Sequence, residues 1–389
     1  MKKMKKIYLI ALIILVSCSN KQINNSSKKT EKKKEIRVEI NYNIETIGII
    51  LDLSELGDYV LSNSSKERNY EFVRLIRNEF KDYQNHPAVL KFNKLNELNL
   101  AHFDHYYYGL SFSKLPEFKL KHTKFNGFYS SETYSHKQID SLLIDFDSSI
   151  RDFYNDANLN DFYTKNSTIY HKIKTEIQSV LPTKIIQTME NYFRIHSNEF
   201  VICPSLTIPN DWNFGPEIKM DKSNIFYYLA GPSYDLKPKR KNIESILKND
   251  SLGFNGKENL TDLAIHEFGH SFVRFLDKNK NIELYKSLSK LNNKQLKKNF
   301  EKIGEGTKWS TIFEEHLVRA NEIMIWREMG NNKMADEKLK YEYEKEGVLY
   351  IKEFVKSLEK YRINKEKYEN FEAYFPKLIS DLNEIENEK

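Results

Sequence analysis

Apolar residues recur at three- and four-residue spacing along much of the chain, as Phe72, Ile76 and Phe80 do. This period places them on one face of an α-helix. The pattern predicts long helices over four stretches, residues 66–85, 87–112, 137–155 and 165–194. It returns after Leu260 and continues to the end of the chain, so helices should dominate the fold.

Two β-prone segments interrupt the helical pattern. Residues 200–202 and 225–229 are rich in β-branched and aromatic side chains, and Pro, Asn, Asp and Gly separate them. Residues 36–53 begin with partly alternating apolar positions, which predicts one or two strands or a strand leading into a helix. We therefore expect an α+β fold, mostly helical, with a small sheet just upstream of residue 260.

The start of the chain has the pattern of a secreted leader. Residues 1–6 are basic, and residues 7–16 are apolar but too few to span a bilayer, which is typical of a signal peptide over residues 1–17. Its end, Leu-Val-Ser-Cys, resembles the lipobox of bacterial lipoproteins, in which cleavage precedes the cysteine and lipid is attached to it. This resemblance implies that lipid on Cys18 attaches the protein to a membrane of the bacterial cell envelope, with the outer membrane as the first candidate. The rest of the protein would then be periplasmic or exposed on the cell surface. The alternative is an ordinary secretion signal followed by an incidental cysteine.

Charge and cysteine content narrow the classes of function. Residues 18–35 lack an apolar period and are rich in Lys, Asn and Ser, which predicts a flexible tether. Of 61 basic and 55 acidic side chains, four lysines lie in the leader and six lysines with two glutamates in the tether, leaving 51 and 53 from Ile36 onward. This neutral body argues against nucleic-acid binding. Cys203 lies in an apolar run and is expected to be a packed hydrophobic residue.

The candidate chemistry lies in the segment LAIHEFGHSF, residues 263–272, which contains the pattern HExxH. His266 and His270 are four residues apart, so both imidazoles lie on one helix face and can bind one metal ion. Glu267 follows His266 directly, where its carboxylate can touch a water on that metal. Two imidazoles and a carboxylate suit Zn²⁺, which in catalytic sites keeps one position for water. Every flanking position is uncharged, as a buried metal-bearing helix requires.

The third ligand has to come from another segment. The residues after His270 exclude the longer pattern HExxHxxGxxH. The helix predicted over residues 309–329 carries several acidic side chains, and helical geometry does not separate Glu314 from Glu315 as the ligand. His316 is a further possibility. Arg319 is four residues after Glu315, so its guanidinium can orient that carboxylate from behind. A solvated charged face is the alternative interpretation of this helix.

The combination of HEFGH at 266–270 with EEHLVRA at 314–320 resembles the gluzincin class of zinc metallopeptidases. It is more closely similar to an uncharacterised family of bacterial lipoproteins that has a HEFxH-type helix and a later E-x-L-V-R-A helix. Residues 85–89 and 212–215 also resemble signatures of that family, so the likeness spans most of the mature chain. The resemblance implies that Glu315 is the third zinc ligand. The gap before it is longer than in thermolysin-like enzymes, so an inserted helix or loop must fill it.

The same resemblance implies a domain organisation and a way of binding substrate. Residues 199–389 would form a zincin-like metallopeptidase region with C-terminal helices, after a mainly helical region at 36–198. In such peptidases an edge strand above the metal pairs with an extended peptide, and residues 225–229 or 201–208 are candidates for it. The alternative is that these strands only fill the sheet. Candidate donors to the developing oxyanion are Tyr227, Tyr228, Tyr234 and His316. The helices after residue 333 have mixed charges, which predicts solvated faces that cover the catalytic half.

Three hypotheses follow from these observations. The first is a lipid-anchored zinc peptidase acting on a peptide or protein, in which Glu267 takes a proton from the attacking water and delivers it to the leaving amine. The second is a non-catalytic surface lipoprotein that keeps a zincin-like fold as a binding module. The third is a metal hydrolase of cell-wall peptide bonds, which shares the site and differs in substrate.

Overall fold

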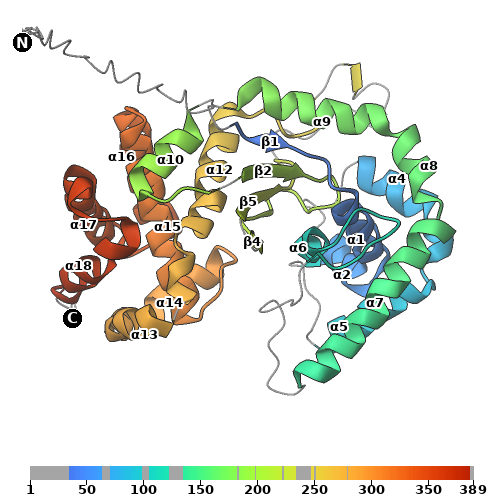
Figure 1. The fold of residues 1–389 in the computed structure, drawn as a ribbon, viewed down its shortest axis with the longest axis horizontal. Helices are drawn as coiled ribbons and strands as arrows, with labels where there is room; N and C mark the ends of the chain where they lie inside the picture. Colours follow the sequence, from blue (N-terminus) through green and yellow to red (C-terminus); the bar gives the residue numbers. More distant parts are fainter. Residues whose placement is uncertain are drawn as a thin grey trace, which may run out of the picture. The chain divides into compact units, whose positions relative to one another are not determined.

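Helices and one small sheet make up the computed structural model (Figure 1). The described residues are 35–63, 71–98, 105–121, 135–181, 184–197, 199–220, 223–233, 247–248, 251–277 and 279–385. They belong to one unit, Lys34–Lys389. The predicted leader, Cys18, Tyr234 and all of the tether except Glu35 lie outside the described residues.

The described chain begins with a strand that leads into a buried helix, one of the arrangements that the sequence allowed. β1 (Arg37–Val38) is followed by α1 (Tyr42–Leu53). Asn41 caps α1, because its side chain accepts hydrogen bonds from two backbone N–H groups of the first turn. Nearly every residue of α1 is buried. The helices packed around it are α2 (Glu55–Asn63), α4 (Glu71–Glu79), α5 (Pro87–Glu97), α6 (His105–Tyr108) and α7 (His136–Asp156).

The predicted helices are present, but several are shorter than the apolar period suggested. The prediction over 137–155 is confirmed by α7. The stretch 165–194 forms two helices, α9 (Ser167–Val180) and α10 (Ile185–Phe193). A third helix, α8 (Leu159–Lys165), precedes them and ends where the predicted stretch begins. The apolar period continues across these breaks because each piece presents its apolar face to the same core. Periodicity therefore located the helices better than their ends.

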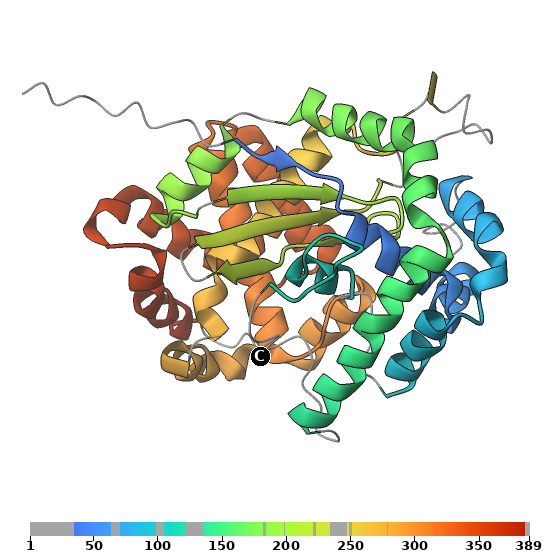
Figure 2. The same cartoon turned by 45° about the vertical axis from the view of Figure 1, so that its right-hand side comes forward.

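The sheet has five strands in the order β1-β2-β5-β3, with β4 also paired to β5 (Figures 1 and 2). β2 (Glu199–Pro204) and β5 (Ser223–Ala230) are parallel and confirm the two β-prone segments. β3 (Asn213–Phe214) and β4 (Glu217–Met220) run antiparallel to β5. Cys203 is buried in β2, and burial raises the pKa of its thiol to about 12. It is the packed hydrophobic residue that the sequence predicted.

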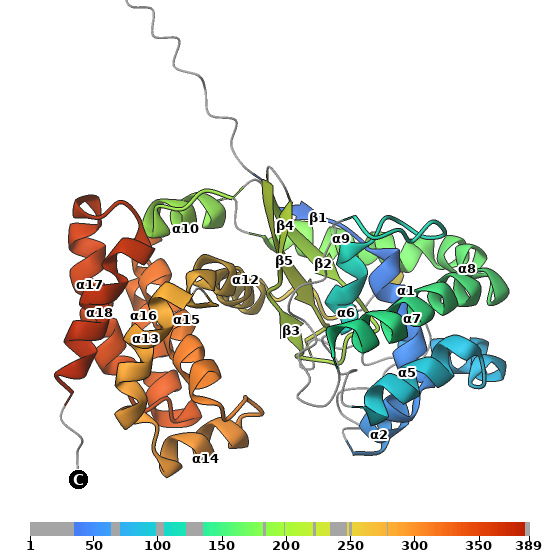
Figure 3. The ribbon, with the colours of Figure 1, turned by 60° about the horizontal axis from the view of Figure 1, so that its bottom comes forward.

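α12 (Lys257–Phe272), the helix with the HExxH pattern, lies between the sheet and the C-terminal helices (Figures 1 and 3). Its Phe268 ring packs on Phe200 of β2 at a centroid distance of 5.3 Å, and Phe272 packs on Phe226 at 5.1 Å. Its other side contacts α15 (Trp309–Glu328). Because neighbours cover both sides, the second half of α12 is apolar nearly all round apart from the motif.

Helices also fill the insertion before α15 and the chain after it. The insertion contains α13 (Asn279–Lys286) and α14 (Lys294–Lys302). After α15 come α16 (Asn332–Tyr341), α17 (Ile351–Asn364) and α18 (Phe371–Asn383). Mostly helical and with a small mixed sheet, the fold confirms the α+β prediction. Within the described part of the chain, no helix combines the length and apolarity needed to cross a membrane.

Glu45 gives the fold a testable pH dependence. This buried carboxyl of α1 accepts a hydrogen bond from the Tyr170 hydroxyl at 3.3 Å, yet burial raises its pKa from 4.5 to about 7. The unfolded chain therefore holds fewer protons than the folded one between these values, and stability falls as pH rises through them. We expect Glu45→Gln to raise the free energy of unfolding by up to about 3 kcal/mol at pH 8, and by little at pH 4.5. Urea unfolding at the two pH values checks this, and an equal effect at both would contradict it.

Candidate metal centre

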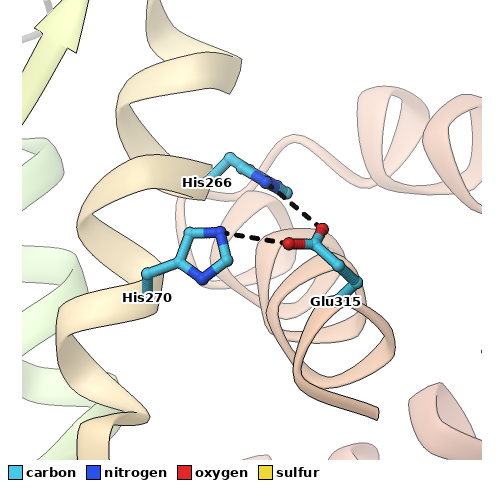
Figure 4. A group of neighbouring side chains, drawn as sticks. All are labelled: His266, His270 and Glu315. Atoms are coloured by element: carbon cyan, nitrogen blue, oxygen red, sulfur yellow. Dashed lines mark ion pairs between the residues drawn. The ribbon is translucent and has the colours of Figure 1, made fainter. Parts of the chain in front are cut away.

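Three side chains from α12 and α15 meet at one point (Figure 4). His266 and His270 lie one turn apart on the same face of α12, with ring centroids 5.1 Å apart. The Glu315 carboxylate of α15 faces both rings: its Oε1 is 3.4 Å from His270 Nε2, and its Oε2 is 3.6 Å from His266 Nε2. One ligand atom from each residue lies within 4.8 Å of the others. The structure thus brings together the three residues predicted to hold zinc.

The surroundings of the two imidazoles fit a cation at this point. His266 Nδ1 lies 3.4 Å from a carboxylate oxygen of Glu322, and His270 Nδ1 lies 3.0 Å from Glu314 Oε1. The contact at His270 is a hydrogen bond, and a carboxylate that accepts from Nδ1 holds the proton on that nitrogen, which leaves the Nε2 lone pair for a metal. Both Nε2 atoms face the same carboxylate. Two nitrogens and one oxygen are the ligand set of many catalytic zinc sites.

The protonation of these groups in the absence of a cation shows how strongly they interact. Burial lowers the pKa of His266 to about 3, which keeps this imidazole neutral, as a metal ligand must be. For His270, burial lowers the pKa, but the carboxylates of Glu315 and Glu314 more than offset it and raise the value to about 9. Burial raises the pKa of Glu315, yet the two histidines and Arg319 outweigh it and hold that pKa below its ordinary value. A negative carboxylate and a cationic imidazole therefore sit where a cation could replace the proton.

Glu314 and Glu315 of α15, either of which could be the third ligand by helical geometry, make different contacts with the histidines. Glu315 faces the Nε2 atoms of both histidines, whereas Glu314 reaches the Nδ1 atom of His270 alone. Of the two, Glu315 is therefore the one placed to reach a cation between the imidazoles, and Glu314 contacts one imidazole at its other nitrogen. Glu314 and Glu315 both contact the His270 imidazole, so a change at one glutamate should affect the contact of the other.

Glu267 lines an open cavity of about 180 Å³ together with His270. The other residues lining this cavity are Asn213, Phe214, Gly215, Pro216 and Arg274. Burial raises the pKa of Glu267 to about 8, although His270 partly offsets the effect. A carboxyl group whose pKa lies near neutrality can both accept and return a proton. Its position beside the three-residue cluster is the one predicted for a general base.

The sheet edge beside this cavity differs from the predicted one. β2 and β5 have paired neighbours on both sides, so neither residues 201–208 nor 225–229 supply an edge strand; that prediction was wrong. β3 and β4 form the edge instead, and among the described strands they pair only with β5. β3 begins with Asn213, and Gly215 and Pro216 lie between the two strands; these residue types are poor strand formers and concealed the strand character of the segment.

Gly215 joins β3 to β4 where the edge passes closest to α12. A Cβ atom at this position would lie 2.0 Å from the backbone oxygen of Glu267. We expect Gly215→Ala to force the edge away from α12 and to lower the free energy of unfolding by about 1–3 kcal/mol, as overpacking does. Thermal unfolding checks this. Gly306→Ala is the matched control, because its Cβ would meet only the Thr311 side chain at 3.1 Å; an equal loss in both variants would contradict the close approach.

Comparison with known proteins places the chain in a family. Residues 36–381 match the model of a domain of unknown function, DUF4932. The chain belongs to this family. Among curated proteins and among solved structures, no match was found.

In this DUF4932 domain, none of the predicted oxyanion donors Tyr227, Tyr228 and His316 lines the Glu267 cavity, and Tyr234 lies outside the described residues. Tyr228 packs on Phe268 of α12 and its hydroxyl donates to Asn213 Oδ1 at 3.0 Å, so the preceding Tyr227 faces the opposite side of the sheet. His316 is buried, stacks on Phe300 and donates through Nδ1 to the Ile312 carbonyl at 2.7 Å. The predictions for Tyr227 and His316 were therefore wrong.

In the DUF4932 domain, Arg319 and Glu322 each contact a member of the three-residue cluster. The Arg319 Nε atom lies 3.3 Å from Glu315 Oε2, where it was predicted to orient that carboxylate. Glu322, which contacts His266 Nδ1, had no predicted role. A signal was available, because Glu322 follows Glu315 by seven residues and so lies two turns further along the same helix face.

Proposed function

We propose that this protein is a zinc-dependent metallopeptidase that hydrolyses peptide bonds. The observation that carries the proposal is the convergence of His266, His270 and Glu315, with Glu267 in the adjoining cavity. The resemblance to gluzincins, in which a later helix supplies a glutamate to the HExxH pair, favours zinc among the divalent cations that this ligand set could bind.

The chemistry of the proposed site divides between the ion and the chain. Zinc held by the three ligands would supply a water of lowered pKa and polarise the carbonyl to be attacked. Glu267 accepts a proton from the water during the attack and donates it to the leaving amine. Arg319 keeps the Glu315 carboxylate ionised and oriented, because its guanidinium lies behind that carboxylate.

A peptide is the substrate class that the cavity favours. One wall is β3 with Gly215 and Pro216 after it, which belong to the sheet edge, and an extended peptide can pair with such an edge, main chain to main chain. Asn213 and Arg274 add polar groups to the lining. We further propose that the protein is attached to the bacterial envelope through lipid on Cys18, so that its substrates are peptides or proteins outside the cytoplasm.

A peptide-library cleavage profile tests the proposal directly. The purified protein is incubated with the library before and after treatment with a zinc chelator, and then with zinc restored. We expect cleavage that the chelator stops and zinc restores, with about one zinc per chain. Bound zinc without cleavage of any peptide would instead favour the binding module, and cleavage confined to cell-wall peptide bridges would favour the third hypothesis.

A further inference from the structure

Two of the proposed zinc ligands, His266 and Glu315, are joined behind the site by a closed series of polar side chains, which we call the polar ring. All of its members are charged except the His266 imidazole, which is neutral. Its members, in order of contact, are His266, Glu322, Lys338, Glu342, Arg319 and Glu315. The last member returns to the first, because Glu315 Oε2 lies 3.6 Å from His266 Nε2. The ring therefore links a ligand on α12 to a ligand on α15.

Lys338 is the member of the ring that comes from α16. Its Nζ lies 2.5 Å from Glu322 Oε1 and 3.7 Å from Glu342 Oε1, and it also pairs with Asp262 of α12. Asp262 is fixed in turn by the Trp326 indole, which donates to its Oδ1 at 2.9 Å. Lys338 thus joins α12, α15 and α16 at one point. The prediction that the helices after residue 333 present only solvated faces was wrong for this side chain.

The other half of the ring reaches Glu315. Glu342, at the first position of a π-helical turn after α16, places one oxygen near Lys338 and the other 2.9 Å from Arg319 Nη1. Arg319 then contacts Glu315 through Nε at 3.3 Å. Glu322 and Glu342 are 1% and 2% exposed, so neither carboxylate is available to water in place of these partners.

A ring of buried and half-buried charges is costly, and well-packed apolar residues often stabilise a core as much or more, so stability alone does not account for it. Here the ring ends at two proposed ligands, because Glu322 contacts His266 and Arg319 contacts Glu315. We propose that Lys338 is a positioning residue of the metal centre, which holds the Glu322 carboxylate against His266. Through Glu342 and Arg319 it also fixes Glu315. This inference rests on the proposed function, since it assumes that the cluster binds a divalent cation.

The role of Lys338 follows from the charges that it separates. It lies between the carboxylates of Glu322, Glu342 and Asp262, which would otherwise repel one another across a buried space. Without the ammonium group these carboxylates should move apart, and Glu322 would leave the Nδ1 atom of His266. The imidazole would then lose the carboxylate that faces its Nδ1 atom, and with it a support for the orientation of the ring.

Zinc affinity of the full-length protein tests the inference independently of catalysis. The dissociation constant is measured by competition with a chromophoric chelator, and folding is checked by circular dichroism and thermal unfolding of the metal-free protein. We expect Lys338→Met and Glu322→Gln each to weaken zinc binding about 10–100-fold, the range for groups that support a ligand. The double variant should lose less than the product of the two single losses, because both changes break the same contact. Lys338→Arg should restore most of the affinity.

The matched control is Lys340→Met, which makes the same change on the same helix at a side chain that is 72% exposed. It should leave zinc affinity unchanged. If charge alone mattered, removing an ammonium near the site would tighten zinc binding; tighter or unchanged binding by folded Lys338→Met would overturn the inference. If Lys338→Met does not fold, Glu322→Gln and Lys338→Arg decide, and unchanged affinity in Glu322→Gln would be equally decisive against it.

Catalysis separates this inference from the proposed function. Weakened zinc binding in the variants without cleavage by the wild type would overturn the peptidase proposal and support the positioning role. Normal zinc binding by Lys338→Met, together with zinc-dependent cleavage by the wild type, would support the peptidase proposal and overturn the positioning role. A wild-type protein that binds no zinc would overturn both.

Discussion

Replacing Glu267 with Gln should lower kcat for peptide cleavage by about 10²–10⁴-fold while zinc stays bound, the range expected for loss of a positioned general base. The amide keeps the shape of the side chain but cannot accept a proton from water. Glu267 is not among the cluster of candidate ligands and lies in the cavity beside His270, so zinc affinity should change little. Steady-state kinetics on a peptide from the library and metal analysis of the same sample measure the two quantities.

Glu258→Gln is the matched control for this experiment. It makes the same chemical change on the same helix, at an exposed position in the first turn of α12. It should leave both kcat and zinc content unchanged. A Glu267→Gln enzyme that retains zinc and cleaves within about threefold of the wild type would remove Glu267 from the mechanism, because general-base loss costs far more. Loss of zinc together with activity would instead make Glu267 a ligand.

The α12 part of the site could be predicted because its information is local. A spacing of four residues puts His266 and His270 on one helix face whatever the rest of the fold does. The uncharged flanks also predicted that α12 would be buried, and it lies between the sheet and α15. The strands β2 and β5 were predicted for a similar reason, since their β-prone residues are contiguous.

The supports of the site could not be predicted, because they depend on how distant helices pack. Glu314 and Glu315 differ by one residue, and only the crossing of α15 with α12 decides which one faces the two Nε2 atoms. Lys338 belongs to a segment of alternating charge that is typical of a solvated helix. Its burial follows from the position of α16 against α15, which leaves no trace in the local pattern.

The edge strands escaped prediction for a different physical reason. β3 and β4 are short, and the residues between them, Gly215 and Pro216, are poor strand formers. The structure explains their presence by other demands: a larger residue at Gly215 would meet the Glu267 carbonyl, and the Pro216 carbonyl accepts a hydrogen bond from Tyr227 N at 2.9 Å. The residues that let this edge approach α12 are therefore the ones with the weakest strand propensity.

Replacing Glu315 with Gln should weaken zinc binding by on the order of 10³-fold, beyond the 10–100-fold loss typical of groups that only support a ligand. Its carboxylate is the one that faces both Nε2 atoms, and a neutral amide oxygen is a much poorer partner for a dication. Because an ion that binds only the folded state stabilises it, zinc should raise the melting temperature of the wild type by several degrees and that of Glu315→Gln by little.

Glu314→Gln is the informative comparison, because it changes the neighbouring residue in the same way. Glu314 touches only the Nδ1 atom of His270, so its loss should weaken zinc binding within the 10–100-fold range and leave a measurable thermal shift. The variant that loses more zinc affinity then identifies the ligand. The sequence alone did not separate Glu314 from Glu315. If Glu314→Gln lost zinc more completely than Glu315→Gln, the assignment of the two residues would have to be exchanged, and the contact of Arg319 with Glu315 would no longer lie behind a ligand.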